Sequence, residues 1–319
     1  MQELVQHSEH VYLSAHQKSA AASSPIVASW RRCMTMHRLQ PEEKRTPIQL
    51  SEAEFRQACE ISENLISEAG DELDRLFQTV GKAGCCLLLT DRNGIALERR
   101  GSRSDDTDFH TLGLWTGAVW TEASMGTNGI GTALADERAV TIYRDQHFFS
   151  SNISLSCTTA PIRDHRGQLA AALDISTCRD DVNDMTITVL AQAVRDAAMR
   201  IETNLFRSAF PGARFLMVPA GSNSAPALLA VDRDDLVLGA PRAARLALKL
   251  DDGRIAAGLP ASDALREERS PPSGDLIEAE RAALRRALSR HNGNVSRAAL
   301  SLGMSRATLH RKMKKLDLH

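Results

Sequence analysis

The sequence contains no long apolar run. No segment approaches the roughly 18 consecutive apolar residues of a membrane-spanning helix, which excludes this class of membrane protein for the residues given. The N-terminal residues include Glu3 and Glu9 and lack the basic-then-apolar order of a secretion signal. We therefore expect a cytoplasmic protein that has no membrane partner.

Cysteine is present without the spacing that binds metals. None of the six cysteines stands in a C-x-x-C pair or in the spacing of a zinc site. In a cytoplasmic protein this pattern favours reduced thiols, and we predict no metal and no cofactor. The cysteines are Cys33, Cys59, Cys85, Cys86, Cys157 and Cys178.

Charge is nearly balanced overall but not along the chain. A content of 43% hydrophobic and 25% charged residues is typical of a folded globular protein, and 319 residues predict two or three domains. The net charge is −1, yet from Arg281 onward ten lysines and arginines stand against one acid, Asp317. This asymmetry predicts that the C-terminal end attracts phosphates while the rest of the chain is repelled by them.

The basic tail has the pattern of two short helices joined by a bend. Asn294 is a good N-cap for the first helix, and Ser305 can cap the second. Gly303 between them suits a left-handed C-cap. The second helix has an apolar stripe that starts at Leu309, and its other side is cationic. The pattern predicts a helix-turn-helix; the alternative is an ordinary helical hairpin with a solvated charged face.

Residues 293 to 314, Gly-Asn-Val-Ser-Arg-Ala-Ala-Leu-Ser-Leu-Gly-Met-Ser-Arg-Ala-Thr-Leu-His-Arg-Lys-Met-Lys, resemble the Fis-type helix-turn-helix of many bacterial transcription regulators. The resemblance implies binding to double-stranded DNA. We expect the second helix to enter the major groove, and six residues to reach it: Ser305, Arg306, Thr308, His310, Arg311 and Lys314. Three further residues are expected at phosphates or at the helix junction: Asn294, Lys312 and Lys315.

The middle of the chain has the alternation and turn signals of an antiparallel sheet. Strands are predicted at residues 85–90, 95–99, 139–143, 157–163 and 169–176, with hairpin turns at 91–94 and 164–167. A long amphipathic helix is predicted over residues 181–206. An antiparallel sheet with helices on one side predicts an α+β domain of sensor-like layout over residues 81–206.

Residues 1–80 are predicted to be helical. Ser24 can cap a helix that begins at Pro25, and Ser51-x-x-Glu54 is the capping box of a longer helical stretch that continues to about Val80. We expect these helices to pack beside the sheet.

Four blocks in this region resemble the GAF domain of the acetoin catabolism regulators: residues 120–134, His147-Phe148, residues 156–162 and residues 173–176. The resemblance covers roughly residues 25–206, and the helix-turn-helix extends it to the end of the chain. It implies a sensor domain for a small effector. Candidate ligand residues within the blocks are Trp120, Glu122, Thr127, Asn128, His147, Phe148, Cys157 and Asp174.

These blocks leave alternatives open. Buried polar groups need partners, so the polar candidates suit either a small polar ligand or internal hydrogen bonds. The block 126–131 has phosphate-loop spacing but no following Lys-Ser/Thr, which favours a glycine turn with Thr127 or Asn128 capping a helix. His147 and Cys157 alone are too few to specify a metal or haem site.

The remaining segments predict a small module and a linker. Residues 207–266 have a strand, turn, strand and helix pattern that resembles a reduced PAS-like module, and residues 267–274 predict a linker. A helix is expected from 275 to 291 within an all-α domain that spans residues 275–319. Its apolar stripe, which contains Ile277, Leu284 and Leu288, has no partner within a lone helix-turn-helix, so we expect a homodimer through this helix.

The acetoin catabolism regulators carry a central ATPase that acts on sigma-54 RNA polymerase. Residues 206–275 are too few to hold one and contain no Gly-x-x-x-x-Gly-Lys-Ser/Thr. The sequence therefore predicts a ligand-responsive regulator, not an enzyme, that acts by occupying its DNA site or by touching RNA polymerase. Two alternatives are an accessory or antagonist subunit of an ATPase-bearing regulator, and a GAF-type enzyme such as a methionine sulfoxide reductase that uses Cys85, Cys86 or Cys157.

Overall fold

The computed structural model describes residues 2–17, 24–218, 227–266, 280–281, 283–285, 287–288, 291, 293–316 and 318. The chain divides into two compact units, Met1–Ala261 and Ser262–His319. No helix among the described residues is long and apolar enough to cross a membrane. The linker predicted at residues 267–274 lies outside the described residues.

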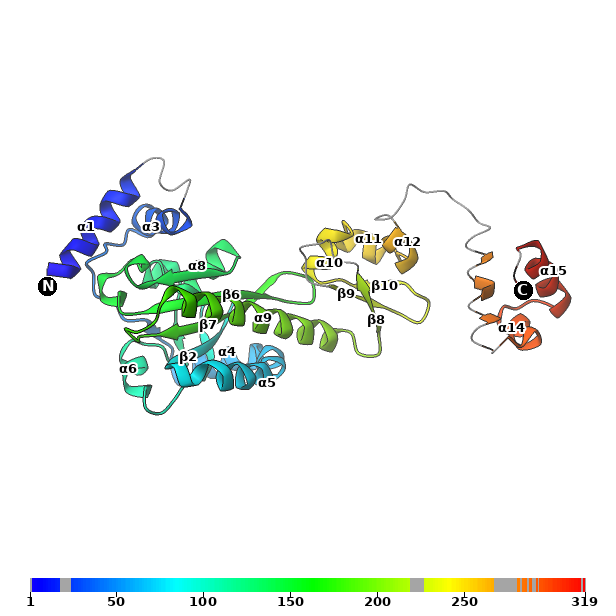
Figure 1. Cartoon of the computed structure of the whole chain (residues 1–319), viewed down its shortest axis with the longest axis horizontal. Helices are drawn as coiled ribbons and strands as arrows, with labels where there is room; N and C mark the ends of the chain where they lie inside the picture. The colour runs from blue at the N-terminus through cyan, green and yellow to red at the C-terminus, as the bar shows by residue number, and fades with distance from the viewer. Residues whose placement is uncertain are drawn as a thin grey trace. The chain divides into compact units, whose positions relative to one another are not determined.

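The first unit is built on a five-stranded antiparallel sheet of order β3-β2-β7-β6-β5 (Figure 1). In both hairpins an aspartate at the strand end, Asp91 or Asp164, accepts hydrogen bonds from the N–H groups two and four residues on. These local bonds fix the turns, and both predicted hairpins are confirmed. The strands are β2 (Cys85–Asp91), β3 (Ala96–Arg100), β5 (Val140–Tyr143), β6 (Ser156–Arg163) and β7 (Leu169–Thr177).

One face of this sheet is covered by α5 (Glu63–Val80) and α9 (Asp184–Ala209), which lie side by side (Figure 1). Alternate residues of β2, such as Leu87 and Leu89, pack there with the apolar stripes of both helices. The helical stretch predicted from Ser51 to Val80 is interrupted at Ser62, which ends α4 (Glu52–Ile61) with its N–H bonded back to the carbonyls of the last turn. The apolar periodicity of the predicted stretch continues across Ser62, so the sequence pattern does not indicate the break.

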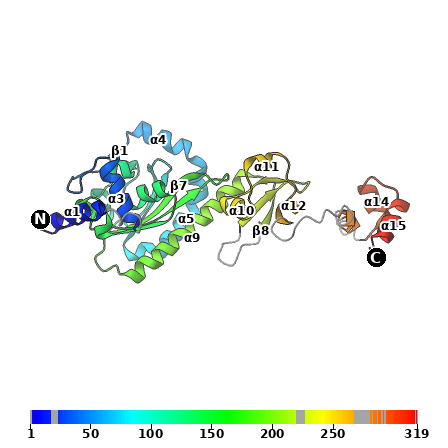
Figure 2. The ribbon, with the colours of Figure 1, turned by 90° about the horizontal axis from the view of Figure 1, so that it is seen from above.

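Short helices cover the face opposite α5 and α9, which Figure 2 shows side by side. The expectation of helices on one side of the sheet alone was therefore wrong. Cys86 and Leu88, the intervening residues of β2, pack there with Phe109, Trp120 and Ile130. These helices are α6 (Asp106–Thr111), α7 (Glu122–Met125) and α8 (Gly129–Asp136), and a small strand pair, β1 (Ile48–Gln49) with β4 (Ala118–Val119), lies beside them. We call the part of the chain from β2 to α9 the sheet domain.

The N-terminal helices α1 (Gln2–His16) and α3 (Pro25–Thr35) share a core with the sheet domain. Val11 and Trp30 pack with Phe148 and Phe149, which follow β5 in the chain. The Ser24 hydroxyl accepts from the N–H of Val27, so the predicted cap of the helix at Pro25 is confirmed.

A three-stranded antiparallel sheet of order β10-β9-β8 follows α9. The strands are β8 (Arg214–Val218), β9 (Ala227–Val231) and β10 (Val237–Gly239), and α10 (Arg242–Ala247) and α11 (Asp252–Ala256) follow them. The helix α12 (Ala261–Arg266) begins at the last residue of the first unit, and its other residues belong to the second. The sequence of this module predicts a helix from residue 241 to 250, and it is observed as α10, which has Leu248 as its C-cap. The helix α11, capped by Asp251, follows it and is not predicted.

The second unit contains α14 (Val295–Ser301) and α15 (Arg306–Lys315). Of the helix predicted over residues 275–291, the structure describes residues 280–281, 283–285 and 287–288 as helical and residue 291 as a turn. Leu284 and Ala287 are buried against Ala298, Leu309 and Leu316 of the helix-turn-helix.

The expectation that this stripe has no partner within the unit was therefore wrong. Leu284 and Leu288 both pack on the helix-turn-helix core, and Ile277 lies outside the described residues. The homodimer loses this support and stays a prediction.

Candidate functional site

The second helix of the C-terminal unit presents an exposed cationic face. Ser305 caps α15 by accepting from the N–H of Thr308 at 3.1 Å. Gly303 has a φ of +64°, the left-handed conformation that the bend requires. Leu309 is fully buried, which fixes the rotation of α15 and turns its charged residues outward.

Most of the predicted DNA-binding residues lie on this exposed face. The exposed ones on α15 and its cap are Ser305, Arg306, His310, Arg311, Lys314 and Lys315, and Asn294 before α14 is also exposed. Thr308 is half-buried, with its hydroxyl 2.8 Å from that of Ser305. Lys312 forms an ion pair with Glu280, and the Asn294 side chain caps α14 at the N–H of Arg297. Lys312 and Asn294 therefore hold the unit together in addition to any role at DNA.

Two of the predicted ligand residues, Glu122 and Thr127, bind the N-terminal helix α3. The buried Glu122 carboxylate accepts from Arg32 Nε at 2.9 Å and Nη2 at 2.8 Å, and also from the Ser29 hydroxyl. Hydrogen bonding to Glu122 raises the pKa of Arg32. The Thr127 hydroxyl lies 2.6 Å from that of Ser29. These contacts attach α3 to the start of α7 and α8.

Asn128 caps α8, as the glycine-turn interpretation predicts. Its Oδ1 accepts from the N–H of Gly131 at 2.8 Å, and its Nδ2 donates to the carbonyl of Gly126 at 2.8 Å. Gly129 faces the sheet so closely that a Cβ there would lie 2.8 Å from Asp174 Oδ1 and from Cys157 Cβ. The glycines thus allow α8 to pack on β6 and β7.

Asp174, Cys157 and His147 form a buried chain of contacts under α8. Ser176 Oγ lies 2.6 Å from Asp174 Oδ2 and 3.1 Å from Cys157 Sγ, and Cys157 Sγ lies 3.5 Å from His147 Nε2. His147 Nδ1 lies 2.9 Å from the carbonyl oxygen of Arg144. A carbonyl can only accept, so Nδ1 carries the proton and Nε2 accepts from the thiol.

Burial dominates the protonation of this chain. It lowers the pKa of His147 to about 4, raises that of Asp174 to about 6, and raises that of Cys157. These directions favour a neutral thiol beside a neutral imidazole, whereas a nucleophilic cysteine needs a thiolate. The described residues contain no group of three or more potential metal ligands.

Trp120 and Phe148 are buried in different clusters. Trp120 donates from Nε1 to the carbonyl of Gly113 at 3.0 Å, and Phe148 packs edge-on against Phe149. The eight predicted ligand residues are therefore distributed among several internal contacts, and every polar side chain among them has a partner within the protein. Ligand binding by these residues stays a prediction.

A residue that the sequence interpretation missed is Arg99 on β3. It stands opposite Leu88 in the strand register, so its side chain points to the face covered by α6, and it is only 10% exposed. Its guanidinium carbon lies 4.1 Å from the centre of the Trp115 ring. Strand alternation places residues 86, 88 and 99 on one face, and this signal could have revealed a buried cation.

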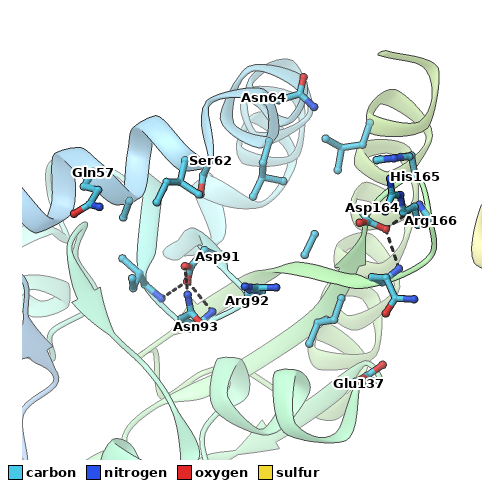
Figure 3. Close-up of a pocket in the computed structure, with 18 of the residues that line it drawn as sticks. Gln57, Ser62, Asn64, Asp91, Arg92, Asn93, Glu137, Asp164, His165 and Arg166 are labelled. Atoms are coloured by element: carbon cyan, nitrogen blue, oxygen red, sulfur yellow. Dashed lines mark hydrogen bonds between the residues drawn. The ribbon is translucent and has the colours of Figure 1, made fainter. Parts of the chain in front are cut away.

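A groove of about 1000 Å³ lies on the other side of the sheet domain (Figure 3). It is bordered by the α4–α5 bend at Ser62, by the two hairpin turns at Asp91 and Asp164, and by Glu137. Carboxylates, arginines and amides mix along its walls. None of the eight predicted ligand residues lines it.

Comparison with known proteins gives two family matches. The model for the N-terminal domain of MimR matches residues 4–203, and the model for the bacterial regulatory protein, Fis family, matches residues 276–316. The first covers more than half of the chain, and the second coincides with the helix-turn-helix.

Curated relatives are transcription regulators. The acetoin catabolism regulatory protein of Cupriavidus necator is 32% identical over 232 residues, which cover 70% of this chain and 34% of the relative. The acetoin dehydrogenase operon transcriptional activator AcoR of Bacillus subtilis is 30% identical, over 47% of this chain and 25% of the relative. The chain thus spans a quarter to a third of the length of these relatives.

Among solved structures, the E. coli DhaR(N)–DhaL complex contains a chain of similar fold, with a TM-score of 0.51, 17% identity, and coverage of 71% of this chain and 76% of that one. This similarity and the sheet order confirm the α+β fold class. The predicted resemblance to acetoin catabolism regulators is confirmed by the curated relatives. The chain belongs to the family of regulators with a MimR-type N-terminal domain, and it ends in a Fis-family helix-turn-helix.

Proposed function

We propose that this protein is a cytoplasmic, sequence-specific DNA-binding transcription regulator that works as a homodimer and responds to a small metabolite bound in its sheet domain. The observation that carries the proposal is the exposed cationic face of α15 on a capped helix-turn-helix. The match to the Fis-family model and the names of the curated relatives support it.

The proposed DNA contacts follow from exposure. Arg306, His310 and Arg311 project from the first turns of α15, the part of a recognition helix that reaches base edges. Arg311 is the candidate for a bidentate contact with a guanine. Lys315, near the C-terminal end, would meet a phosphate. A two-fold dimer would place two such helices in successive major grooves, roughly one helical turn apart.

Regulation would take place without ATP hydrolysis. The described residues that follow α9 form a small three-stranded sheet, and the sequence between α9 and the helix-turn-helix has no phosphate-binding lysine loop. The protein would act by occupying its operator or by touching RNA polymerase directly. A ligand would control it only by binding the DNA-competent and the incompetent dimer with different affinity.

The first experiment is a footprint of the purified protein on DNA upstream of its own gene, with and without a metabolite extract. The salt concentration is the same in both samples, because affinity for DNA depends strongly on it. Protection of an inverted repeat that changes with the extract is the expected result. An absence of protection in either condition would refute the proposal.

Arg311→Ala tests the recognition face. It should cost about 1–3 kcal/mol of operator binding and relax specificity at one base pair. Arg297→Ala removes the same charge from the exposed side of α14 and is the matched control. It should weaken binding to all sequences alike, or not at all. Unchanged operator affinity in Arg311→Ala would exclude this face.

A second candidate is an accessory or antagonist subunit of a longer relative. One observation favours it: the structurally similar DhaR N-terminal chain was solved in complex with a protein, DhaL. Mixing the purified protein with an ATPase-bearing relative distinguishes the two. A stable mixed complex that lowers ATP turnover would favour the accessory role, whereas DNA protection by this protein alone favours the regulator.

A further inference from the structure

Arg99 is an unusual cation for the interior of a domain. Its side chain is 10% exposed and lies between the Trp115 ring, at 4.1 Å, and the Phe109 ring, at 5.8 Å from the guanidinium carbon. Arg100, next in the chain, points to the other face of the sheet and pairs with Asp74 and Glu98. One arginine is therefore held by ion pairs and hydrogen bonds, and the other is held mainly by aromatic rings.

The hydrogen-bonding needs of Arg99 are not met by the described part of the chain. Nη1 lies 2.8 Å from Asp106 Oδ1, but the pair lacks hydrogen-bond geometry. Nε and Nη2 are both buried, and neither has a described residue in hydrogen-bond geometry; the Cys86 thiol beside the guanidinium is at most a weak acceptor. A buried donor without an acceptor costs about 1–3 kcal/mol, so this arrangement calls for an acceptor that the described residues do not supply.

The geometry of the two free donors specifies that acceptor. Nε and Nη2 share one edge of the planar guanidinium, and their parallel N–H bonds match the two oxygens of a carboxylate. Trp115, stacked on the guanidinium plane, fixes the orientation of this edge and offers an apolar surface to the rest of a ligand.

We propose that the sheet domain binds a small carboxylate whose two oxygens accept hydrogen bonds from Nε and Nη2 of Arg99. This inference rests on the proposed ligand response, and it names the class of ligand and its anchor. None of the eight ligand residues predicted from the sequence is part of this site; the Cys86 thiol, on the same face, contacts the guanidinium region.

Binding requires a local movement. The Gly101 backbone passes so close to the guanidinium that a Cβ at 101 would overlap Nη2 and the central carbon. Asp106, 35% exposed and the first residue of α6, would be repelled by an incoming carboxylate. The segment from Gly101 to Asp106 is therefore the part that moves aside, and α6 would occupy different positions in the free and bound states.

The experiment uses the full chain with acetate, butyrate, pyruvate and benzoate as probes, each compared with its amide. Binding is followed by the melting temperature and by the Nε–H resonance of Arg99 in protein labelled with ¹⁵N-arginine. At least one carboxylate should shift both readouts at millimolar concentration, and its amide should not. Arg99→Lys, which keeps the charge and removes the two-donor edge, should weaken binding roughly ten- to hundredfold. Arg100→Lys is the matched control and should bind as the wild type does.

Asp106→Asn should change the affinity for the probe in the direction opposite to Arg99→Lys. Removal of the competing carboxylate should strengthen probe binding several-fold, which a purely structural pair would not do. The proposal is overturned if no carboxylate binds, if Arg99→Lys binds as tightly as Arg100→Lys, or if a crystal structure with the probe shows only an ordered water at Nε and Nη2.

The same variants separate this inference from the proposed function. A footprint that responds to extract in the wild type and equally in Arg99→Lys would refute the Arg99 site and leave the regulator intact. Carboxylate binding that depends on Arg99, in a protein that protects no DNA, would refute the regulator and leave the site intact.

Discussion

Asp174 should make the sheet domain less stable as the pH rises. Its carboxyl group lies on β7 beneath α8, 1% exposed, and accepts hydrogen bonds from the hydroxyls of Thr159 and Ser176. Burial raises its pKa to about 6, and the two hydroxyls offset only part of that effect. In the unfolded chain the same group titrates near 3.9.

The direction of this change in stability with pH follows from proton binding. Between about pH 4 and pH 6 the folded state holds a proton that the unfolded state has released, so the stabilising contribution is complete below pH 4 and is lost as the pH rises through 6. A difference of about 2 pKa units corresponds to about 3 kcal/mol in the free energy of unfolding.

Asp174→Asn removes this dependence and keeps an oxygen that can accept from the same hydroxyls. Urea unfolding followed by tryptophan fluorescence suits the test, because all three tryptophans (residues 30, 115 and 120) lie in the first unit. Relative to the variant, the wild type should lose about 3 kcal/mol between pH 4 and pH 7.

His147 acts in the opposite direction, since burial lowers its pKa to about 4 and so costs stability as the pH falls below 6.5. It is common to both proteins, so its contribution cancels in the difference. Asp71→Asn, at an exposed position on α5, is the control, and because it keeps Asp174 its stability should follow the wild-type pH curve. Parallel curves for wild type and Asp174→Asn would refute the assignment of a raised pKa to this carboxyl.

Three further changes test the packing around the candidate sites. Gly129→Ala would force a Cβ against Asp174 and the neighbouring strand, and should lower the free energy of unfolding by about 3 kcal/mol in urea titrations. Arg32→Met leaves the buried Glu122 carboxylate without its guanidinium and should cost about 3 kcal/mol; a double variant with Glu122→Met should recover most of this loss in a double-mutant cycle. Asn294→Ala removes the cap of α14 and should cost the C-terminal unit about 1 kcal/mol in thermal unfolding.

The features that the sequence predicts well are those fixed by neighbours in the chain. The hairpins turn at Asp91 and Asp164 because each side chain bonds to its own turn, and Asn294 and Ser305 cap their helices within three residues. Such bonds need no knowledge of the tertiary fold. The helix-turn-helix is therefore the part of the molecule that could be predicted in most detail.

Long-range pairing could not be predicted in the same way. The sequence predicts Glu122 as a ligand residue because it is an acid in a glycine-rich block, yet its partner Arg32 lies 90 positions earlier. The apolar stripe that contains Leu284 predicts a second subunit, yet Leu284 packs on its own helix-turn-helix. In both cases the sequence showed correctly that a group required a partner and did not show where the partner was.

The buried polar side chains of the sheet domain differ in whether their hydrogen bonds are satisfied within the protein. Glu122, Asn128 and Asp174 are polar and buried, but each has partners inside the protein, and any ligand would have to replace those bonds before gaining its own. At Arg99 two donors have no described partner, so a ligand there gains hydrogen bonds that the free protein does not make, although the segment from Gly101 to Asp106 has to move aside. For equal contact area the second position binds a small molecule more tightly, because the unpaired donors are a cost already present in the free protein. An effector of this domain should therefore be sought first among molecules that can satisfy Arg99.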